Sequence, residues 1–308
     1  MKRFLFKLLF FLLIIGLTYP TIVVGFQELA PSRIKRNVNY KRGSYGHLNS
    51  RIKDIQNFKD IDILFLGSSH CYRGFDPRIF KPYGYTTFNL GSSAQSHIQT
   101  NILLSRHLES LFPKLVIYEV YPGTMVTDGV ESSLDLIAND RNDWLTLKMI
   151  WSTMNLKVLN TAIYGFYTDF LGKDKNYKEP VRKENHRDTY ISGGFVQKDV
   201  KTYQYDSMKK GTYTFNPIQL EHFRKNLEFL KQGGIPYILV QAPITKARYN
   251  AKTNNQEYTK LMSTYGTYLD FNTKLNLDDS LYFYDSHHLN QNGVELFNVS
   301  LIKFLQTK

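Results

Sequence analysis

Residues 61–76 have the sequence IDILFLGSSHCYRGFD, and the rest of the chain is best interpreted outward from them. The first six residues are almost all apolar, which is typical of a strand buried on both faces of a parallel sheet. The strand stops at Gly67, Ser68, Ser69 and His70. Ligands bind at the carboxyl ends of the strands in open α/β sheets, so two hydroxyls and an imidazole there indicate nucleophilic chemistry. A plain turn is the alternative, because glycine and serine are common in turns.

Strand and helix patterns alternate on both sides of a central interruption. A β-rich run at 85–90, a helical pattern at 94–111 and an apolar run at 115–120 predict strand, helix, strand. The alternation resumes with a helix at 217–232, a strand at 235–241, a helix at 256–268, a short strand at 281–284 and a last helix to about 304. We therefore expect a three-layer α/β/α sandwich with a parallel, flavodoxin-like sheet. Residues 126–215 lose the alternation and predict an insertion, which is either a lid or substrate wall or a mobile loop.

The N-terminal residues predict a transmembrane helix. Lys2, Arg3 and Lys7 accompany an apolar run to residue 26, about the ~20 residues that cross a bilayer. A cleaved secretory signal is the alternative, but its apolar core would be shorter and a small-residue cleavage site should follow. Positive charge before the run places the N-terminus in the cytoplasm, although basic residues after it act against that orientation.

These patterns give the expected domain organisation and location. Residues 1–27 form an uncleaved signal anchor, and residues 28–60 form a juxtamembrane linker with one short helix near 48–58. The folded domain is expected at 61–308, with the insertion at about 126–215. A single-pass anchor of this kind predicts a membrane-anchored protein whose folded domain is extracytoplasmic, either periplasmic or at the cell surface.

The composition limits the classes of partner. A chain of 308 residues can form one sizeable core or a core with a large insertion. The formal net charge of +12 favours anionic membrane surfaces or anionic wall polymers. No zinc-finger spacing, basic recognition helix or RNA-binding signature is present, so we expect no nucleic acid partner. A single cysteine, Cys71, excludes an internal disulfide and is interpreted as a small buried hydrophobe rather than a nucleophile.

A second chemically informative stretch, YDSHHLNQNG, lies at 284–293. Asp285 and His288 are three residues apart in a predicted loop, where a carboxylate can orient an imidazole and stabilise its protonated form. That imidazole can act as general base for a serine hydroxyl, which the loop after the first strand offers. His287 is a rival base. Outside this group no spaced His/Asp/Cys cluster appears, so we expect no metal and no cofactor.

On these residues the chain resembles the SGNH (GDSL-like) hydrolase and acyltransferase superfamily. The first block of that family is matched by GSS at 67–69, the second by the glycine of NLG at 89–91, and the last by DSHHLN at 285–290 with Gly293. Ser68 stands where the family usually has aspartate. The asparagine of the third block has no counterpart in EVYPG at 119–123. The chain looks most similar to the membrane-anchored subset that contains envelope O-acyltransferases and the D-alanyl transfer proteins of teichoic acid modification.

The resemblance implies the roles of individual residues. Ser69 would be the nucleophile, His288 the base and Asp285 its orienting partner. The backbone amides of Ser69 and Gly91 would be oxyanion donors, a kind of contact whose loss typically costs ~10²–10³ in rate. Further residues are candidates for contact with a substrate: His70, Asn89, His287 and Asn290.

The resemblance also implies a function. The chain would be a serine-dependent esterase or O-acyltransferase that acts, through an acyl-serine, on acyl esters of cell-envelope glycans or polymers. An acylated carbohydrate or envelope polymer and a membrane acyl-donor protein are the partners expected. The alternative is a catalytically silent glycan-binding or accessory protein of a membrane acylation system, which the missing third-block asparagine favours.

Overall fold

The computed structural model describes residues 1–44, 46–199, 201–204 and 207–307. Its centre is a sheet of five parallel strands in the order β2-β1-β3-β7-β8. The strands are β1 (Ile63–Leu66), β2 (Thr87–Asn89), β3 (Leu115–Glu119), β7 (Tyr237–Gln241) and β8 (Tyr268–Asp270). Counted along this sheet alone, the order is 2-1-3-4-5, which is the flavodoxin-like order. The predicted α/β fold with a parallel sheet is confirmed.

The central strand β1 is buried on both faces because its side chains alternate between two hydrophobic clusters. Leu64 and Leu66 belong to the larger cluster, which includes residues of α5 (His97–Leu111) and α9 (Pro217–Gln232). Ile63 and Phe65 belong to the other cluster. That second cluster is covered by α3 (Ser69–Gly74), α4 (Pro77–Phe80) and α14 (Gln291–Gln306).

The C-terminal part differs from the prediction in one strand. The predicted helix at 256–268 ends early, as α11 (Asn255–Ser263), and the fifth strand of the sheet follows it as β8. The apolar run at 281–284, predicted as a strand, overlaps the one-turn helix α13 (Asp279–Tyr282). The physical reason is a cap: the Asp278 side chain accepts hydrogen bonds from the backbone of Ser280 and Leu281, which favours a helical turn. Short helices α10 (Lys246–Asn250) and α12 (Phe271–Lys274) complete this region.

The described part of the central region, 126–199, 201–204 and 207–215, contains helices and a small second sheet. The helices are α6 (Val130–Asn139), α7 (Trp144–Thr153) and α8 (Leu156–Leu171). Helices α7 and α8 are separate because Met154 has a left-handed backbone and Asn155 caps α8. An antiparallel sheet contains β4 (Arg182–Lys183), β5 (Asp188–Ile191) and β6 (Phe195–Lys198). Strand β6 contacts α3, so this region adjoins the carboxyl end of β1.

The segment expected as a linker contributes buried residues. It contains α2 (Leu48–Asp54), near the short helix that the sequence predicts, and the 3₁₀ turns Ser32–Ile34 and Ile55–Asn57. Arg51 is fully buried, and its guanidinium donates to the carbonyls of Gly194 and Gly46 at 2.8 and 2.9 Å. A buried, paired cation of this kind ties the segment to the central region. Further 3₁₀ turns lie at Lys81–Tyr83, Pro122–Met125 and Glu184–His186.

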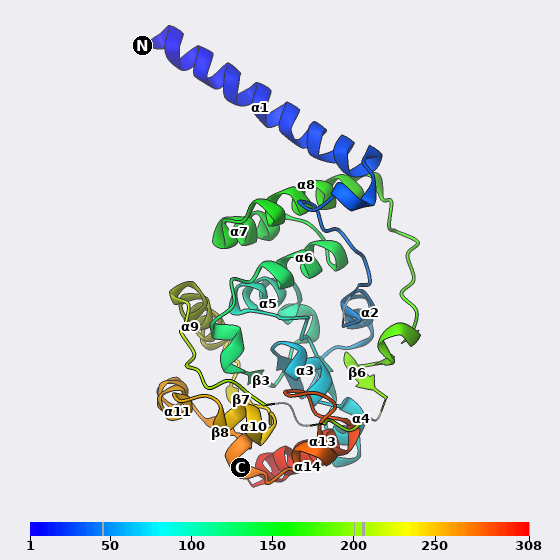
Figure 1. Ribbon diagram of the computed structural model, residues 1–308, viewed down its shortest axis with the longest axis vertical. Helices are drawn as coiled ribbons and strands as arrows, with labels where there is room; N and C mark the ends of the chain where they lie inside the picture. Colours follow the sequence, from blue (N-terminus) through cyan, green and yellow to red (C-terminus); the bar gives the residue numbers. More distant parts are fainter. Residues whose placement is uncertain (45, 200, 205–206, 308) are drawn as a thin grey trace.

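Helix α1 (Lys2–Leu29) is long and apolar enough to span a membrane. Figure 1 shows it extending away from the rest of the chain, with its C-terminal end beside α8. The Tyr19 hydroxyl donates to the Asn160 side chain at 2.5 Å, and Glu28 forms an ion pair with Lys173 at 2.6 Å. These contacts hold the C-terminal part of α1 against α8 and the residues that follow α8.

We predict that Asp54→Ala destabilises the full chain, because Asp54 connects α2 to the second sheet. Its carboxylate accepts hydrogen bonds from the Tyr190 hydroxyl, the Ser192 hydroxyl and the Gly193 amide at 2.8, 3.0 and 2.9 Å. Loss of hydrogen bonds to a charged acceptor should lower the free energy of unfolding by about 2–4 kcal/mol. Urea denaturation in detergent measures the change, with the exposed acid Glu109→Ala as control. Equal unfolding midpoints for the two variants would show that α2 is not part of the cooperative core.

Candidate active site

Ser69 lies directly after β1 because of a close backbone packing. Gly67 has φ +144°, and a Cβ there would lie 2.9 Å from the Cβ of Glu119 and 3.0 Å from its carbonyl oxygen. Only glycine allows this approach of the β1 loop to β3. The chain then turns into α3, whose N-cap is Ser68 and whose first residue is Ser69. The short turn therefore places the Ser69 hydroxyl at the carboxyl end of the sheet.

Asp285 and His288 lie in the loop between α13 and α14. One carboxylate oxygen of Asp285 accepts the backbone amides of His287 and His288 at 2.9 and 2.8 Å. The other lies 2.8 Å from Nδ1 of His288, and Nε2 of His288 lies 2.8 Å from Oγ of Ser69. The structure thus joins Ser69 to a residue 219 positions away and brings the three residues expected as a triad together. With Nδ1 protonated, Nε2 is the nitrogen that accepts the hydroxyl proton.

The charges of this group follow from burial and hydrogen bonding. Burial acts to raise the pKa of Asp285, but the hydrogen bond and charge of His288 outweigh it and hold the pKa well below its usual range. Burial lowers the pKa of His288, while the hydrogen bond and charge of Asp285 oppose that shift. The carboxylate is therefore ionised and the imidazole neutral near pH 7, which is the state a general base requires.

We predict that esterase activity rises with pH through one acidic limb whose midpoint lies below the usual histidine pKa of ~6.5. The sign follows from burial: the pKa of His288 is lowered, so the ring loses its proton, and becomes an acceptor, at a lower pH. Profiles of kcat/KM between about pH 4 and 8 measure the limb. A limb centred above 7 would show that another group is the base.

The two amides expected as oxyanion donors differ in their surroundings. The amide of Ser69 occupies the first helical position, where the helix itself provides no acceptor. The amide of Gly91 donates to Oδ1 of Asn89 at 3.1 Å. A Cβ at Gly91 would lie 2.9 Å from the Ser68 carbonyl oxygen, so glycine is required there for packing against the nucleophile loop. Oxyanion binding by Gly91 would need its amide to leave Asn89.

Two residues expected to contact substrate are structural in this arrangement. Asn89 is fully buried, and its side-chain amide donates to the Cys71 carbonyl at 2.7 Å. Asn290 is 1% exposed, caps α14 through Gly293 and donates to the Leu281 carbonyl. Both side chains are thus engaged with the backbone beneath or beside the site, and their contact with a substrate stays a prediction.

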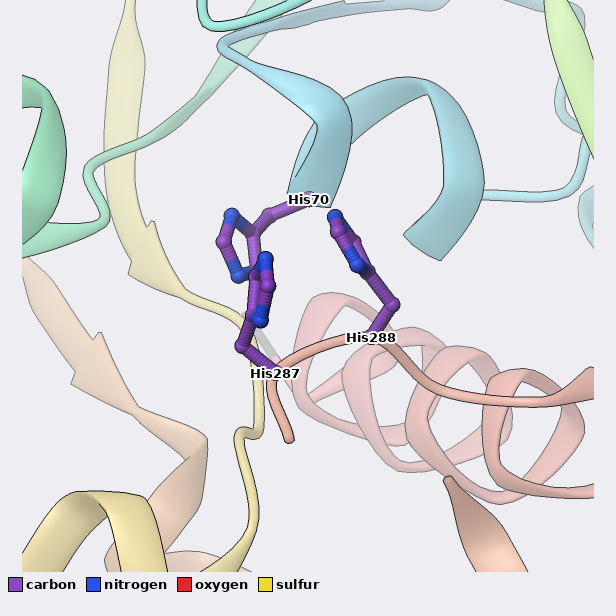
Figure 2. Close-up of side chains that lie close together, drawn as sticks. All are labelled: His70, His287 and His288. Atoms are coloured by element: carbon purple, nitrogen blue, oxygen red, sulfur yellow. The ribbon is translucent and has the colours of Figure 1, made fainter. Parts of the chain in front are cut away.

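His70, His287 and His288 form a histidine cluster (Figure 2), and their ligand atoms lie within 4.8 Å of one another. Burial lowers the pKa of His70 and of His287, the latter to about 3. Nδ1 of His70 faces the Ser68 hydroxyl at 3.2 Å, and its buried Nε2 has no hydrogen-bond partner in the described part of the chain. Three imidazoles are suitable zinc ligands. A metal on all three rings would, however, take Nε2 of His288 from Ser69.

Two cavities open beside Ser69 and share Ser69, Ala94 and His287 in their walls. The first, called here the Arg248 cavity, has a volume of about 430 Å³; its further lining includes His70, Tyr121, Tyr213, Arg248 and Lys252. The second, called here the Tyr284 cavity, has a volume of about 460 Å³; its further lining includes Arg73, Lys183, Asp188, Lys198, Tyr284 and His288. The nucleophile expected from the sequence therefore has space for a substrate group on each side.

Comparison with known proteins gives likenesses in structure alone. No family model matches the sequence, and no curated protein matches it. A GDSL-like lipase from Bacteroides thetaiotaomicron VPI-5482 is similar at 11% identity and TM-score 0.43, over 85% of this chain and 98% of that one. A provisionally assigned acylhydrolase from Bacteroides fragilis NCTC 9343 is similar at 13% identity and TM-score 0.41, over 85% and 98%. At these values the likenesses carry no weight for function, which rests on the geometry above.

Sequence reasoning overlooked Glu119, which lies at the end of β3 beneath the nucleophile loop. It is 1% exposed, and no cation among the described residues forms an ion pair with its carboxylate. Burial raises the pKa of Glu119 to about 8, although backbone amides of Tyr121, Ala242 and Ser68 act to lower it. Its carboxyl is therefore protonated near neutrality. The one acid in the apolar run LVIYEV at 115–120 was a signal that could have identified it.

We predict that Glu119→Gln removes a pH-dependent part of the stability. Unfolded glutamate ionises near its reference pKa of 4.5, whereas folded Glu119 keeps its proton to about pH 8. The unfolded state therefore binds fewer protons in that window, and wild-type stability falls as pH rises through it. Relative to the variant, the loss should be on the order of 3 kcal/mol. Urea midpoints at about pH 5 and 8 measure it, with Glu109→Gln as exposed control; parallel curves for all three proteins would exclude a buried neutral acid.

Proposed function

We propose that this chain is a serine-dependent esterase or O-acyltransferase of the SGNH type, which forms an acyl intermediate on Ser69. The observation that carries the proposal is the hydrogen-bonded series from Ser69 through His288 to Asp285, at 2.8 Å for each step. Such a series activates a hydroxyl at neutral pH and has no comparable structural purpose, because it spans a surface loop and a helix start.

The chemistry follows from the positions of these groups. The Ser69 oxygen attacks the carbonyl carbon of an ester while Nε2 of His288 takes its proton. Collapse of the tetrahedral intermediate gives the acyl-serine, and the leaving alkoxide receives that proton from His288. Water or a second hydroxyl then attacks the acyl-serine while Nε2 of His288 takes its proton. The bond between the acyl carbon and Oγ of Ser69 breaks, His288 returns the proton to Ser69, and the acid or new ester leaves. The two cavities that share Ser69 in their walls provide space for the acyl group and for the alcohol.

The envelope setting remains part of the proposal. Helix α1 would hold the domain at a membrane as a single-pass anchor, with the domain outside the cytoplasm. A formal charge of +12 would attract the domain to an anionic membrane or polymer. An acylated glycan or envelope polymer is then the substrate class, and a membrane acyl-donor protein the partner that would make the reaction a transfer.

A second candidate is a catalytically silent binding protein. The Gly91 amide is engaged by Asn89, and the third-block asparagine has no counterpart at 119–123. An incomplete oxyanion site would leave the triad geometry without transition-state stabilisation. The two candidates differ in whether Ser69 reacts with an electrophile.

We predict that a fluorophosphonate probe labels Ser69 and that Ser69→Ala abolishes both labelling and ester turnover. The reason is that Nε2 of His288 accepts the proton of this hydroxyl and of no other in the described residues. Peptide mapping and turnover of an acetyl ester are the measurements, with Ser68→Ala as the matched control. Folded wild-type protein that stays unlabelled would support the silent binding protein.

We predict that the triad variants are non-additive. Asp285→Asn presents the wrong partner to Nδ1 of His288 and should lower kcat by ~10⁴, as in other triads. His288→Ala should be at least as severe, and the double variant should match the His288 single variant because the residues act as one unit. Independent multiplication of the two losses, or inactivation by His287→Ala alone, would exclude this triad.

A further inference from the structure

We propose that the Arg248 cavity binds a negatively charged part of the substrate, so that the preferred esters carry a carboxylate or phosphate near the reacting carbonyl. This inference rests on the proposed function and specifies its substrate class. It is carried by two cations that line the cavity beside Ser69 and that have no carboxylate partner among the described residues.

Arg248 is the first of these cations. It is partly buried at the cavity wall, and its Nε and Nη1 donate to the hydroxyls of Tyr121 and Ser286 at 3.1 and 3.2 Å. Both acceptors are uncharged, and Nη2 has no acceptor in the described part of the chain. A guanidinium offers five N–H groups in a planar fork that matches carboxylate and phosphate oxygens. Two neutral hydroxyls therefore orient the fork and leave its charge unbalanced.

Lys252 is the second cation. Its ammonium lies 4.7 Å from the ring centre of Tyr213, which also lines the cavity. No acid within the described residues forms an ion pair with it. A ring face orients an ammonium but does not neutralise it. Tyrosine rings and hydroxyls thus hold both positive charges of the cavity in place. A bound anion would balance both charges.

The Tyr284 cavity on the other side of Ser69 provides the contrast. Its cations already have acidic partners: Arg73 with Asp188 at 2.8 Å, Lys198 with Asp188 at 3.2 Å, and Lys183 with Glu179 at 2.5 Å. These pairs balance the charge of that wall without a ligand. The two sides of the nucleophile therefore differ, and the excess positive charge is on the Arg248 side.

Asp285 is the acid whose charge acts on Arg248, where it favours the protonated guanidinium. That carboxylate is already bound by Nδ1 of His288 and by two backbone amides, so it does not serve as an ion-pair partner. The Asp285 carboxylate would repel an anion in the cavity unless Arg248 and Lys252 bind that anion. The same charges disfavour an acyl group that carries an ammonium, such as an alanyl group.

The charge can belong to either part of the ester, and paired substrates distinguish the two. For the acyl side, para-nitrophenyl hemiglutarate is compared with para-nitrophenyl valerate, which has the same chain length and no charge. For the alcohol side, para-acetoxybenzoate is compared with its methyl ester. The measured quantity is the ratio of kcat/KM for the charged ester to that for the neutral one, because this ratio cancels effects on the triad.

We expect the ratio for one pair to fall about tenfold or more in Lys252→Gln and in Arg248→Gln, as for loss of a charge-assisted contact. Arg248→Lys should restore part of the ratio, and high salt should lower the wild-type ratio. The matched control is Lys246→Gln, an exposed lysine of the same helix outside the cavity, which should keep the wild-type ratio. The pair that responds identifies whether the acyl group or the alcohol carries the charge.

Two outcomes separate this inference from the proposed function. Turnover of the neutral esters with ratios that no variant changes would overturn the anionic subsite and leave the esterase standing. If no ester is turned over, calorimetry of para-acetoxybenzoate and of monomethyl glutarate with the Ser69→Ala protein decides. Binding that weakens about tenfold when Arg248→Gln is added supports the subsite without the enzyme; no difference between the two proteins overturns it.

Discussion

The site depends on one packing constraint, the approach of the β1 loop to the end of β3. Gly67 lies against Glu119 with no space for a side chain, and Gly91 packs in the same way on the Ser68 carbonyl. These two contacts bring the ends of three neighbouring strands together above a buried acid. Because the acid is protonated near neutrality, it places no negative charge beneath the nucleophile loop. A substituent at either glycine would move Ser69 relative to the loop that carries His288.

Around this point the charges are arranged asymmetrically. Asp285 is ionised, while the buried rings of His70, His287 and His288 are neutral, so the inner site contains one negative charge on the far side of His288 from Ser69. The positive charges lie further out, in the walls of two cavities. Neutral rings close to the nucleophile do not oppose protonation of His288 as charged rings would. The outer cations Arg73 and Arg248 act to lower the pKa of His288, after burial, which is the larger cause.

The two cavities also bear on whether the proposed reaction is a hydrolysis or a transfer. A hydrolase needs space for one ester and a water molecule, whereas a transferase must also receive a second alcohol. Ser69 is shared by both cavities, so the acyl-serine would remain accessible from each side. The region 126–215, which the sequence predicts as a lid or wall, supplies much of one wall through β4, β5 and β6. Its packing against α3 makes the wall part of the fold.

The sequence by itself determined the strands at 63–66, 87–89, 115–119 and 237–241, because each lies in a short β-rich or apolar run that turn residues follow. It also indicated Ser69, Asp285 and His288, since each follows or joins such an element in a short stretch of polar residues. Local sequence patterns of this kind suffice to predict an element where the backbone pairing and the burial in the fold agree with the pattern.

Only the tertiary structure decided the remaining features. The apolar run at 281–284 was predicted as a strand, but the cap by Asp278 forms a helical turn there, and β8 pairs with β7 as the fifth strand of the sheet. The burial of the asparagines at 89 and 290, and their hydrogen bonds to the backbone, are likewise seen only in the folded chain. Arg248 and Lys252 carry no motif; their meaning depends on which carboxylates lie near them, and spatial neighbours of that kind are separated in the sequence by many residues. The charge balance depends on which residues lie near one another in the folded protein, so the sequence alone does not show it.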